Sequence, residues 1–274
     1  MSSPLVSIII PTYNRLYALA ELLESLRRQT YQNFEIIIIN DFGQLVDNII
    51  SLYPELKITV INLLENRKHV YARNQGVLKA RGEYVMLIDD DDILLPKHLE
   101  QMVGEIEGVD LVYSDVEIVN YEWENKMRVP KSRYLFAYKL DLEGMRKFST
   151  FVPSGCLYKK EIHNQIGFFD ETLMNYWDWD FFLSVSNSFK VKRVPVASVL
   201  YEFSDTGSNQ SKNLSSMRKY LDKLAEKHDL GYLPTKNFFL LLEEAEVKNR
   251  QASSHVVWDG LPIHSRFIQD RGEG

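Results

Sequence analysis

Short apolar runs alternate with helical repeats over the first ninety residues of the chain. Runs rich in β-branched residues predict strands at residues 5–10, 34–39, 58–63 and 84–88. Helices are predicted between them, at residues 16–26, 45–53 and 70–80. Strands and helices in this order are typical of a mostly parallel sheet with helices on both faces. The unbroken isoleucines at 36–39 predict that the second strand is buried on both sides.

The pattern becomes less regular after residue 92. Helices are predicted at 96–107, 160–166 and 179–188, and strands at 109–113 and 151–158. Residues 123–138 show no clear period, and 191–203 predict either paired strands or one strand with a bend. Composition predicts a loop at 204–211. Two helical segments follow within 213–250, separated by Gly231 and Pro234, and the last two dozen residues are expected to form a tail or a docking segment.

Composition narrows the class of protein. Hydrophobic residues make up 45% and charged residues 26% of the chain, as in ordinary globular proteins. The 32 basic and 38 acidic residues give a net charge of −6, which argues against nucleic acid as the main partner. The apolar runs are shorter than the roughly 20 residues that span a bilayer. The opening residues lack the basic leader of a secretory signal. The lone cysteine, Cys156, excludes an internal disulfide, fits a cytoplasmic location and is expected in the core.

Polar residues follow three of the predicted strands directly. They are residues 11–15, residues 40–41, and the aspartates at 89–92. In parallel sheets, ligands bind beyond the carboxyl ends of the strands. We therefore expect these three sets to meet in one crevice.

Four consecutive aspartates repel one another at close range. A divalent cation removes that cost, and carboxylate oxygens suit Mg²⁺ or Mn²⁺. The sequence therefore predicts a metal site at residues 89–92. The alternative is an acidic loop that caps the next helix, with Asp92 favouring its N-terminus.

Other residues near this edge suit a nucleotide diphosphate. Tyr13 is able to stack on a base, and Asp41 is able to accept a hydrogen bond from a base imide. Arg73 presents a planar fork that suits a diphosphate. The alternatives are a packing aromatic for Tyr13, a cap for the helix near Leu45 for Asp41, and a surface salt bridge for Arg73.

A second cluster, residues 176–180, places carboxylates among aromatic rings. Desolvation by such rings makes a carboxylate more basic, which suits Asp178 as a general base toward a hydroxyl. The rings of Tyr176, Trp177 and Trp179 offer flat faces to a sugar. The alternative is a helix N-terminus capped by Asp178, with the aromatic rings in the core.

These motifs together resemble the family 2 glycosyltransferases, which have the GT-A fold. The resemblance covers roughly residues 4 to 203. It is carried by Val6-Ser7-Ile8-Ile9-Ile10-Pro11-Thr12-Tyr13-Asn14-Arg15, Ser25-Leu26, Gln29-Thr30-Tyr31, Asn33-Phe34-Glu35, Ala72-Arg73-Asn74-Gln75-Gly76, Ala80-Arg81-Gly82-Glu83-Tyr84, Leu87-Ile88-Asp89-Asp90-Asp91-Asp92, Leu95-Pro96, Leu99, Gly167-Phe168-Phe169-Asp170-Glu171 and Trp177-Asp178-Trp179-Asp180. Their order and spacing make the resemblance specific.

The resemblance implies an α/β fold with a mostly parallel central sheet flanked by helices. Residues 1–205 would form the GT-A domain, with a Rossmann-like nucleotide-sugar-binding half at 1–92 and an acceptor half at 93–205. Residues 206–274 would form a C-terminal helical extension and tail. The helical segment 213–250 is a candidate for contact with the acceptor, a membrane surface or a second subunit in a homodimer, and the sequence does not choose among them.

The resemblance also implies an inverting, metal-assisted transfer from a nucleotide-diphosphate sugar, with UDP favoured, to a saccharide or lipid-linked acceptor. Polysaccharide or glycoconjugate synthesis in the cytoplasm, or at the inner membrane face, is the expected setting. Asp178 would be the catalytic base, and Asp91 would bind Mn²⁺ or Mg²⁺. Tyr176, Trp177 and Trp179 would contact the acceptor. The nucleotide-binding set would be Pro11, Thr12, Tyr13, Arg15, Asp41, Arg73, Asp89 and Asp90.

Two segments depart from the family pattern. Asn40-Asp41-Phe42-Gly43 stands where an Asp-Asp-Gly-Ser-like turn is common, which affects base selectivity. Tyr201-Glu202-Phe203-Ser204 stands where many members carry Tyr-Arg-x-His, so a histidine credited with metal or phosphate contact is missing. Glu202 is the candidate to replace it.

Two other functions compete with the transferase. The spacing Asp89-x-Asp91 after a strand also resembles the nucleophile loop of haloacid-dehalogenase-type phosphatases, which use Mg²⁺. A catalytically inactive nucleotide-sugar-binding module is the non-enzymatic alternative. Hydrolysis of the donor by water would distinguish a transferase from such a module.

Overall fold

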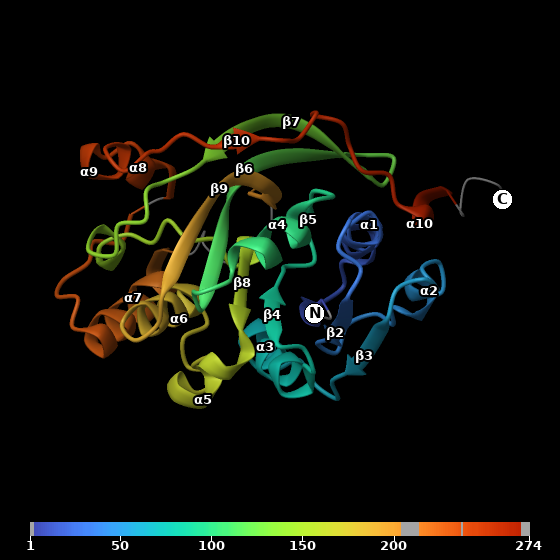
Figure 1. Cartoon of the computed structure of the whole chain (residues 1–274), viewed down its shortest axis with the longest axis horizontal. Helices are drawn as coiled ribbons and strands as arrows, with labels where there is room; N and C mark the ends of the chain where they lie inside the picture. The colour runs from blue at the N-terminus through green and yellow to red at the C-terminus, as the bar shows by residue number, and fades with distance from the viewer. Residues whose placement is uncertain (1–2, 204–213, 237, 270–274) are drawn as a thin grey trace.

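The computed structural model describes residues 3–203, 214–236 and 238–269, so the predicted loop at 204–211 lies outside the described residues. The strands of the first half run parallel in the order β4-β1-β2-β3 (Figure 1). Their bounds are β1 Val6–Thr12, β2 Phe34–Asn40, β3 Ile58–Asn62 and β4 Tyr84–Leu87. The parallel sheet predicted from the first ninety residues is confirmed.

Helices cover both faces of this sheet. One face carries α1 (Leu16–Arg27), α2 (Asp47–Ile50) and α4 (His98–Glu105), and the other carries α3 (Lys68–Lys79), α5 (His163–Ile166) and α6 (Trp177–Ser186). The isoleucines of β2 divide between two cores, since Ile36 and Ile38 pack on the first face and Ile37 and Ile39 on the second. Burial on both sides of β2 is therefore confirmed. Gly76 lets α3 approach β1, because a Cβ at this position would collide with Ile9.

The second half extends the same sheet with strands of both directions. The order continues from β4 through β8, β6 and β9, while β7 pairs with β6 and β5 with β9. The bounds are β5 Ile93–Leu94, β6 Leu111–Glu124, β7 Met127–Phe136, β8 Cys156–Lys159 and β9 Val191–Glu202. Strands β6 and β9 are parallel, whereas β8 is antiparallel to both β4 and β6.

Several boundaries differ from the predicted ones. Residues 123–138, which show no period, contain the end of β6 and the whole of β7. β7 is an outer strand paired with β6, and its polar residues obscure the alternation. The predicted strand at 151–158 begins only at Cys156, because Pro153–Gly155 forms the 3₁₀ turn η2. Cys156 is buried, as expected. The helix predicted at 45–53 is only a single turn, α2. The helix predicted at 179–188 is α6, which begins and ends two residues earlier. Residues 191–203 form one strand, β9, with register shifts against β6.

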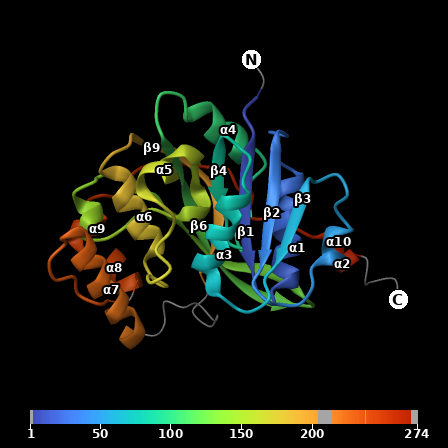
Figure 2. The same cartoon turned by 90° about the horizontal axis from the view of Figure 1, so that it is seen from below.

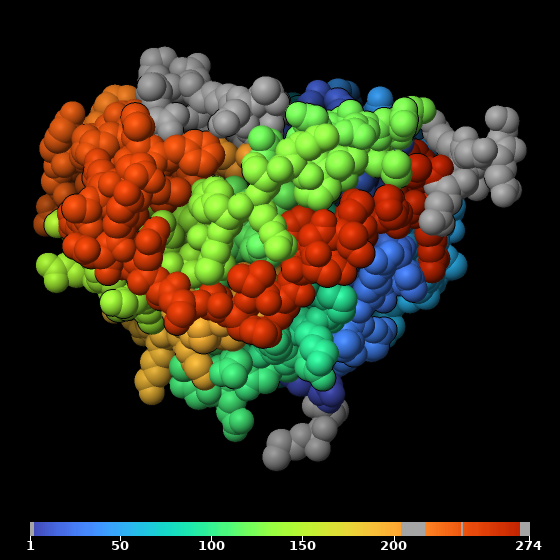
Figure 3. All heavy atoms as spheres, turned by 90° about the horizontal axis from the view of Figure 1, so that it is seen from above, coloured from blue at the N-terminus to red at the C-terminus, as the bar shows by residue number. Residues whose placement is uncertain are grey.

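The C-terminal part wraps around the domain. It contains α7 (Leu214–His228), α8 (Phe238–Leu242), α9 (Ala245–Lys248), β10 (His255–Val256) and α10 (Arg266–Gln269). Two short 3₁₀ turns, η1 (Gly144–Arg146) and η3 (Lys160–Ile162), lie earlier in the chain. Figures 1 and 3 show that the red C-terminal segment runs from the helices α7–α9 to the blue N-terminal part. The segment expected to be a tail or a docking segment therefore docks on its own chain, through β10 on β9 and α10 near α1.

No helix among the described residues combines the length and the apolar character needed to cross a membrane.

Candidate active site

The carboxyl ends of β1 and β4 bring the predicted nucleotide and metal residues together. The hydroxyl Oγ1 of Thr12 donates to Oδ2 of Asp90 over 2.6 Å. Arg15 lies 3.5 Å from Asp90 and pairs with Asp91. Arg73, on α3, pairs with Asp89. The predicted residues after β1 and after β4 therefore contact one another at this edge of the sheet, and Figure 2 shows β1, β2 and β3 side by side.

The four aspartates occupy different environments. Asp89 is partly exposed, whereas Asp90 and Asp92 are buried. Burial raises the pKa of Asp90 to about 7 and that of Asp91 to about 6. The carboxylate of Asp92 accepts hydrogen bonds from the Ser154 hydroxyl and, over 3.0 Å, from the backbone N–H of Glu202. Asp92 thus joins β4 to η2 and β9, and the alternative that it caps the next helix is wrong.

The acidic set fits a hard divalent cation. Carboxylate oxygens of Asp89, Asp91 and Asp92 all lie within 4.8 Å of one another. Oxygen donors at such spacing suit Mg²⁺ or Mn²⁺. Asp92 belongs to the predicted run 89–92, whereas the family resemblance implied Asp91 alone as the metal ligand; its place in this set depends on the turn between β4 and β5.

Arg73 is fixed between an anion and an aromatic ring. Its side chain is only 3% exposed, and its guanidinium carbon lies 4.1 Å from the ring centroid of Trp177. The surface salt bridge considered as the alternative is therefore wrong. The Nε of Arg73 has no hydrogen-bond partner among the described residues. A buried cation with an unused donor, held at the rim of an acidic site, suits a phosphate.

Asp41 and Tyr13 lie at the ends of β2 and β1. The Asp41 carboxylate accepts the backbone N–H groups of Arg67 and Lys68 over 2.7 and 2.9 Å. It therefore caps α3, and the alternative that it caps the helix near Leu45 is wrong. Tyr13 is 49% exposed, so packing does not explain its ring. Pro11 is buried within β1, where it pairs with Ile39 of β2.

Asp178 lies in the first turn of α6. Tyr176 precedes this helix with a φ of 65°, so the chain turns sharply there, a conformation rare for a residue other than glycine. Burial raises the pKa of Asp178 to about 6, against the opposing effect of backbone N–H groups in the first turn and of Arg73. The charge of Asp89 raises the same pKa. The start of α6 lies next to the Arg73–Asp89 pair, because the guanidinium of Arg73 packs on the ring of Trp177.

A cavity of about 590 Å³ opens beside Asp178. Tyr176 and Trp179 line it, whereas Trp177 is buried against Arg73 and is not among the lining residues. The indole N–H of Trp179 donates to the carbonyl of Met145 over 2.7 Å, which fixes that ring. The tryptophans are therefore buried at a helix N-terminus, as in the alternative considered above. At the same time, the carboxylate of Asp178 lines a cavity.

The structure adds a buried cluster that sequence reasoning missed. Arg128 of β7 pairs with Glu21 of α1 over 2.6 Å and with Glu202 of β9, and it donates to the backbone carbonyl of Asp91. Glu202 stands where the family often has its late histidine region, and here it supports the acidic loop. Arg128 and Glu21 are 107 residues apart, so no local pattern indicates their contact.

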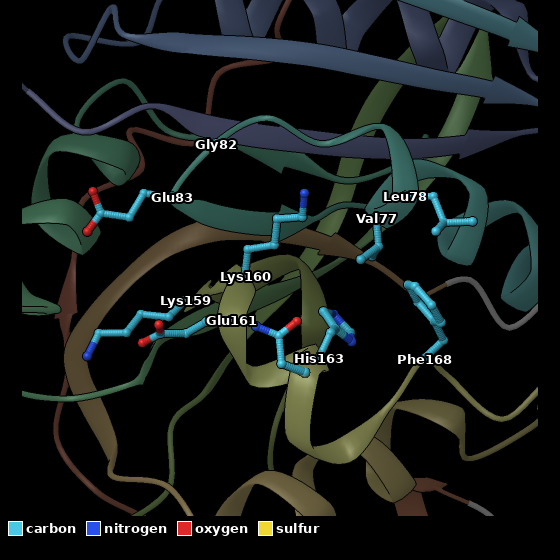
Figure 4. Close-up of a pocket in the computed structure, with 10 residues that line it drawn as sticks. Val77, Leu78, Gly82, Glu83, Lys159, Lys160, Glu161, His163 and Phe168 are labelled. Carbon is cyan, nitrogen blue, oxygen red and sulfur yellow. The ribbon is translucent and has the colours of Figure 1, made fainter.

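A second hollow, of about 810 Å³, lies at the amino end of β4, away from the aspartates. Figure 4 shows Val77, Leu78 and Phe168 at one end of it and Glu83 and Lys159 at the other. None of the predicted site residues lines this hollow.

Comparison with protein families gives a match to the family described as glycosyl transferase family 2, over residues 7–167. The Bacillus subtilis protein named uncharacterized glycosyltransferase YwdF is 57% identical over 263 residues, which are 96% of this chain and 98% of that protein. The matched family region includes the aspartates 89–92, whereas Asp178 lies beyond it.

Solved structures share the fold. Staphylococcus aureus TarS 1–349 in complex with UDP-GlcNAc has a TM-score of 0.64 at 21% identity, covering 81% of this chain and 66% of TarS 1–349. The mannosyltransferase PcManGT of Pyrobaculum calidifontis, in complex with GDP-Man and Mn²⁺, has a TM-score of 0.60 at 16% identity, covering 85% of this chain and 67% of PcManGT.

Proposed function

The chain belongs to glycosyl transferase family 2, and we propose that it transfers a sugar from a UDP-sugar to a hydroxyl acceptor with inversion of the anomeric centre. One observation carries this proposal: Arg73, paired with Asp89 of the acidic set, packs on the ring of Trp177, and the next residue, Asp178, lines a cavity. A nucleotide-diphosphate donor and an acceptor are therefore able to meet at one place. The fold shared with a UDP-GlcNAc complex supports the choice of donor.

The donor would bind along the edge of the sheet. Tyr13 offers its exposed ring to the base, and Asp41, at the start of α3, lies where a base imide is able to donate to it. Pro11 and Thr12, at the end of β1, would form the floor of the nucleotide site. Asp89 would contact the ribose, and Arg73 the diphosphate. Asp90 would act through Thr12 and Arg15, which it holds in place.

Asp91 would hold Mn²⁺ or Mg²⁺, together with Asp89 and Asp92. When bound, the ion supplies Lewis-acid stabilisation of the leaving diphosphate. Arg15 and Arg73 place two positive charges at the same edge, where they would stabilise the negative charge of the diphosphate.

Asp178 would take the proton of the acceptor hydroxyl. The hydroxyl oxygen attacks the anomeric carbon on the face opposite the diphosphate, a new carbon–oxygen bond forms, and the bond to the UDP oxygen breaks with UDP as the leaving group. A raised pKa makes Asp178 a stronger base than an exposed aspartate.

Calorimetric titration of UDP, GDP and dTDP, each with and without Mn²⁺, tests the donor site. We expect tight, Mn²⁺-dependent binding of UDP, lost at least tenfold in Asp91→Ala because that variant lacks a metal ligand. Asp47→Ala, an exposed aspartate on α2, is the matched control and should bind like the wild type. UDP affinity that is equal with and without Mn²⁺ in all proteins would remove the metal assignment, and no nucleotide binding would remove the donor site.

The competing functions separate clearly from this one. The matched family region includes residues 89–92, so the acidic run belongs to a glycosyltransferase domain rather than to a phosphatase. An inactive binding module would bind UDP-sugar without hydrolysing it. Slow release of sugar to water, abolished by Asp178→Asn, supports the transferase over the module.

A further inference from the structure

We propose that the acceptor carries an apolar group next to its reacting hydroxyl, and that the C-terminal helices form the wall of the cavity that binds this group. The inference rests on the proposed role of Asp178, because the cavity is called an acceptor site only if that carboxylate is the base. It assigns to α7 and α8 a role in substrate selection.

The reactive carboxylate is among the residues that line the cavity, and none of the proposed nucleotide-binding residues is. Asp178 and Trp179 of α6 line it, as does Tyr176, which directly precedes this helix. The C-terminal part adds Leu221 of α7 and Phe238 and Leu241 of α8 to the lining. A molecule whose hydroxyl reached Asp178 would therefore have its neighbouring atoms between α6 and α8.

The walls are built from aromatic and aliphatic side chains. Phe238 stands at their centre, with its ring centroid 5.0 Å from that of Phe203, 5.9 Å from Phe136 and 6.2 Å from Phe148. Phe203 directly follows β9, Phe136 ends β7, and Phe148 lies in the segment before η2. The volume, about 590 Å³, is that of a pocket for a small ligand.

Apart from Asp178, the charged residues of the lining make ion pairs or hydrogen bonds with other protein groups, although Nε of Arg250 has no hydrogen-bond partner among the described residues. Lys147 pairs with Glu246 over 2.6 Å, and Lys236 pairs with Glu244. Arg250 donates to the hydroxyl of Thr150 over 2.9 Å and to the carbonyl of Phe148 over 3.1 Å. Most of the lining residues are apolar, so a sugar filling the cavity would bury most of its hydroxyls against carbon, which is costly without hydrogen-bond partners. A hydrocarbon group incurs no such cost, so the surface favours a lipid-linked or similarly amphiphilic acceptor.

A series of alkyl glucosides tests this assignment. Butyl, hexyl and octyl glucoside, below the concentrations at which they form micelles, are titrated calorimetrically into the full chain without donor. Each added methylene should lower Kd about threefold to fourfold, so that octyl glucoside binds about a hundredfold more tightly than butyl glucoside.

Two neighbouring leucines of α8 give a matched pair of variants. Leu241 lines the cavity, whereas Leu240 is exposed. Leu241→Gln should weaken octyl glucoside binding about tenfold with little change for butyl glucoside, and Leu240→Gln should behave as the wild type. A Kd independent of chain length, or the same dependence in all three proteins, would overturn the proposal.

UDP titration with Mn²⁺ on the same proteins separates the two claims. Failure of the wild type to bind UDP would count against the proposed transferase and leave the chain-length result standing. UDP binding with no chain-length effect would leave the donor site standing and remove the apolar acceptor group. The wild-type series decides the proposal by itself, even if Leu241→Gln does not fold.

Discussion

At the scale of single residues, two opposing influences set the basicity of Asp178. Burial disfavours the charged carboxylate, whereas the N–H groups of the first turn of α6 and the guanidinium of Arg73 favour it. Burial is the stronger influence, and the pKa is raised to about 6. The carboxylate is therefore ionised at neutral pH and still more basic than an exposed aspartate.

This pKa predicts the pH dependence of transfer. A base works only when deprotonated, so kcat, measured at saturating donor and Mn²⁺, should rise with pH through about 6 and level off above 7. Asp178→Asn should lower kcat at least a hundredfold at every pH and leave UDP affinity unchanged. A kcat that is flat from pH 5 to 8 in the wild type, or substantial transfer by the variant, would contradict the role of Asp178.

At the scale of elements, Arg128 joins three parts of the chain that local structure does not connect. Its side chain is 1% exposed and lies between Glu21 of α1 and Glu202 of β9. It also donates to the backbone carbonyl of Asp91, so the turn end of the β6–β7 hairpin supports the loop of residues 89–92. A buried charge is tolerated here because each group has a partner of opposite sign.

Removing the cation would leave two buried carboxylates without their partner. Arg128→Met should lower the free energy of unfolding by about 3–5 kcal/mol, measured by urea denaturation. Lys131→Met on the same strand removes an exposed partner of Glu124 and should leave the unfolding midpoint nearly unchanged. Equal stability of the two variants would show that the Arg128 cluster does not stabilise the fold.

At the scale of the whole molecule, the C-terminal segment ties the two ends of the sheet together. It adds β10 to β9 and then reaches α1 and α2 at the other end (Figure 3). There Arg266 donates to the carbonyl of Leu52 over 2.7 Å, and Phe267 packs against Tyr17 with ring centroids 5.1 Å apart. One continuous sheet therefore crosses the proposed boundary at residue 92. The C-terminal segment 255–269, called the strap below, packs against the part of the chain before that boundary.

This strap should contribute to global stability. Phe267→Ala removes a buried ring and should lower the free energy of unfolding by about 3 kcal/mol. Leu261→Ala, at an exposed position of the same segment, is the control, with an expected change within about 0.5 kcal/mol. If urea denaturation gave both variants the wild-type midpoint, the strap would not contribute to the stability of the domain.

The sequence by itself determined the parallel first half of the sheet and the residues that meet at its edge. Runs such as 36–39 and the repeat at 16–26 act through neighbours a few positions away, so periodicity reports them directly. The carboxyl ends of parallel strands share an edge, so the meeting of Thr12 with residues 89–92 follows from the strand order alone.

Only the tertiary structure decided which distant groups satisfy one another. Asp92 bonds to Ser154 and Glu202 rather than capping a helix, Asp41 caps α3, and Arg128 pairs with Glu21 across 107 residues. Such partners are chosen by packing, because any buried charge must find an opposite group wherever the folded chain brings one. The same holds for the cavity beside Asp178, whose lining forms only when α7 packs against α6 and Phe238 of α8 packs against Phe136 and Phe203.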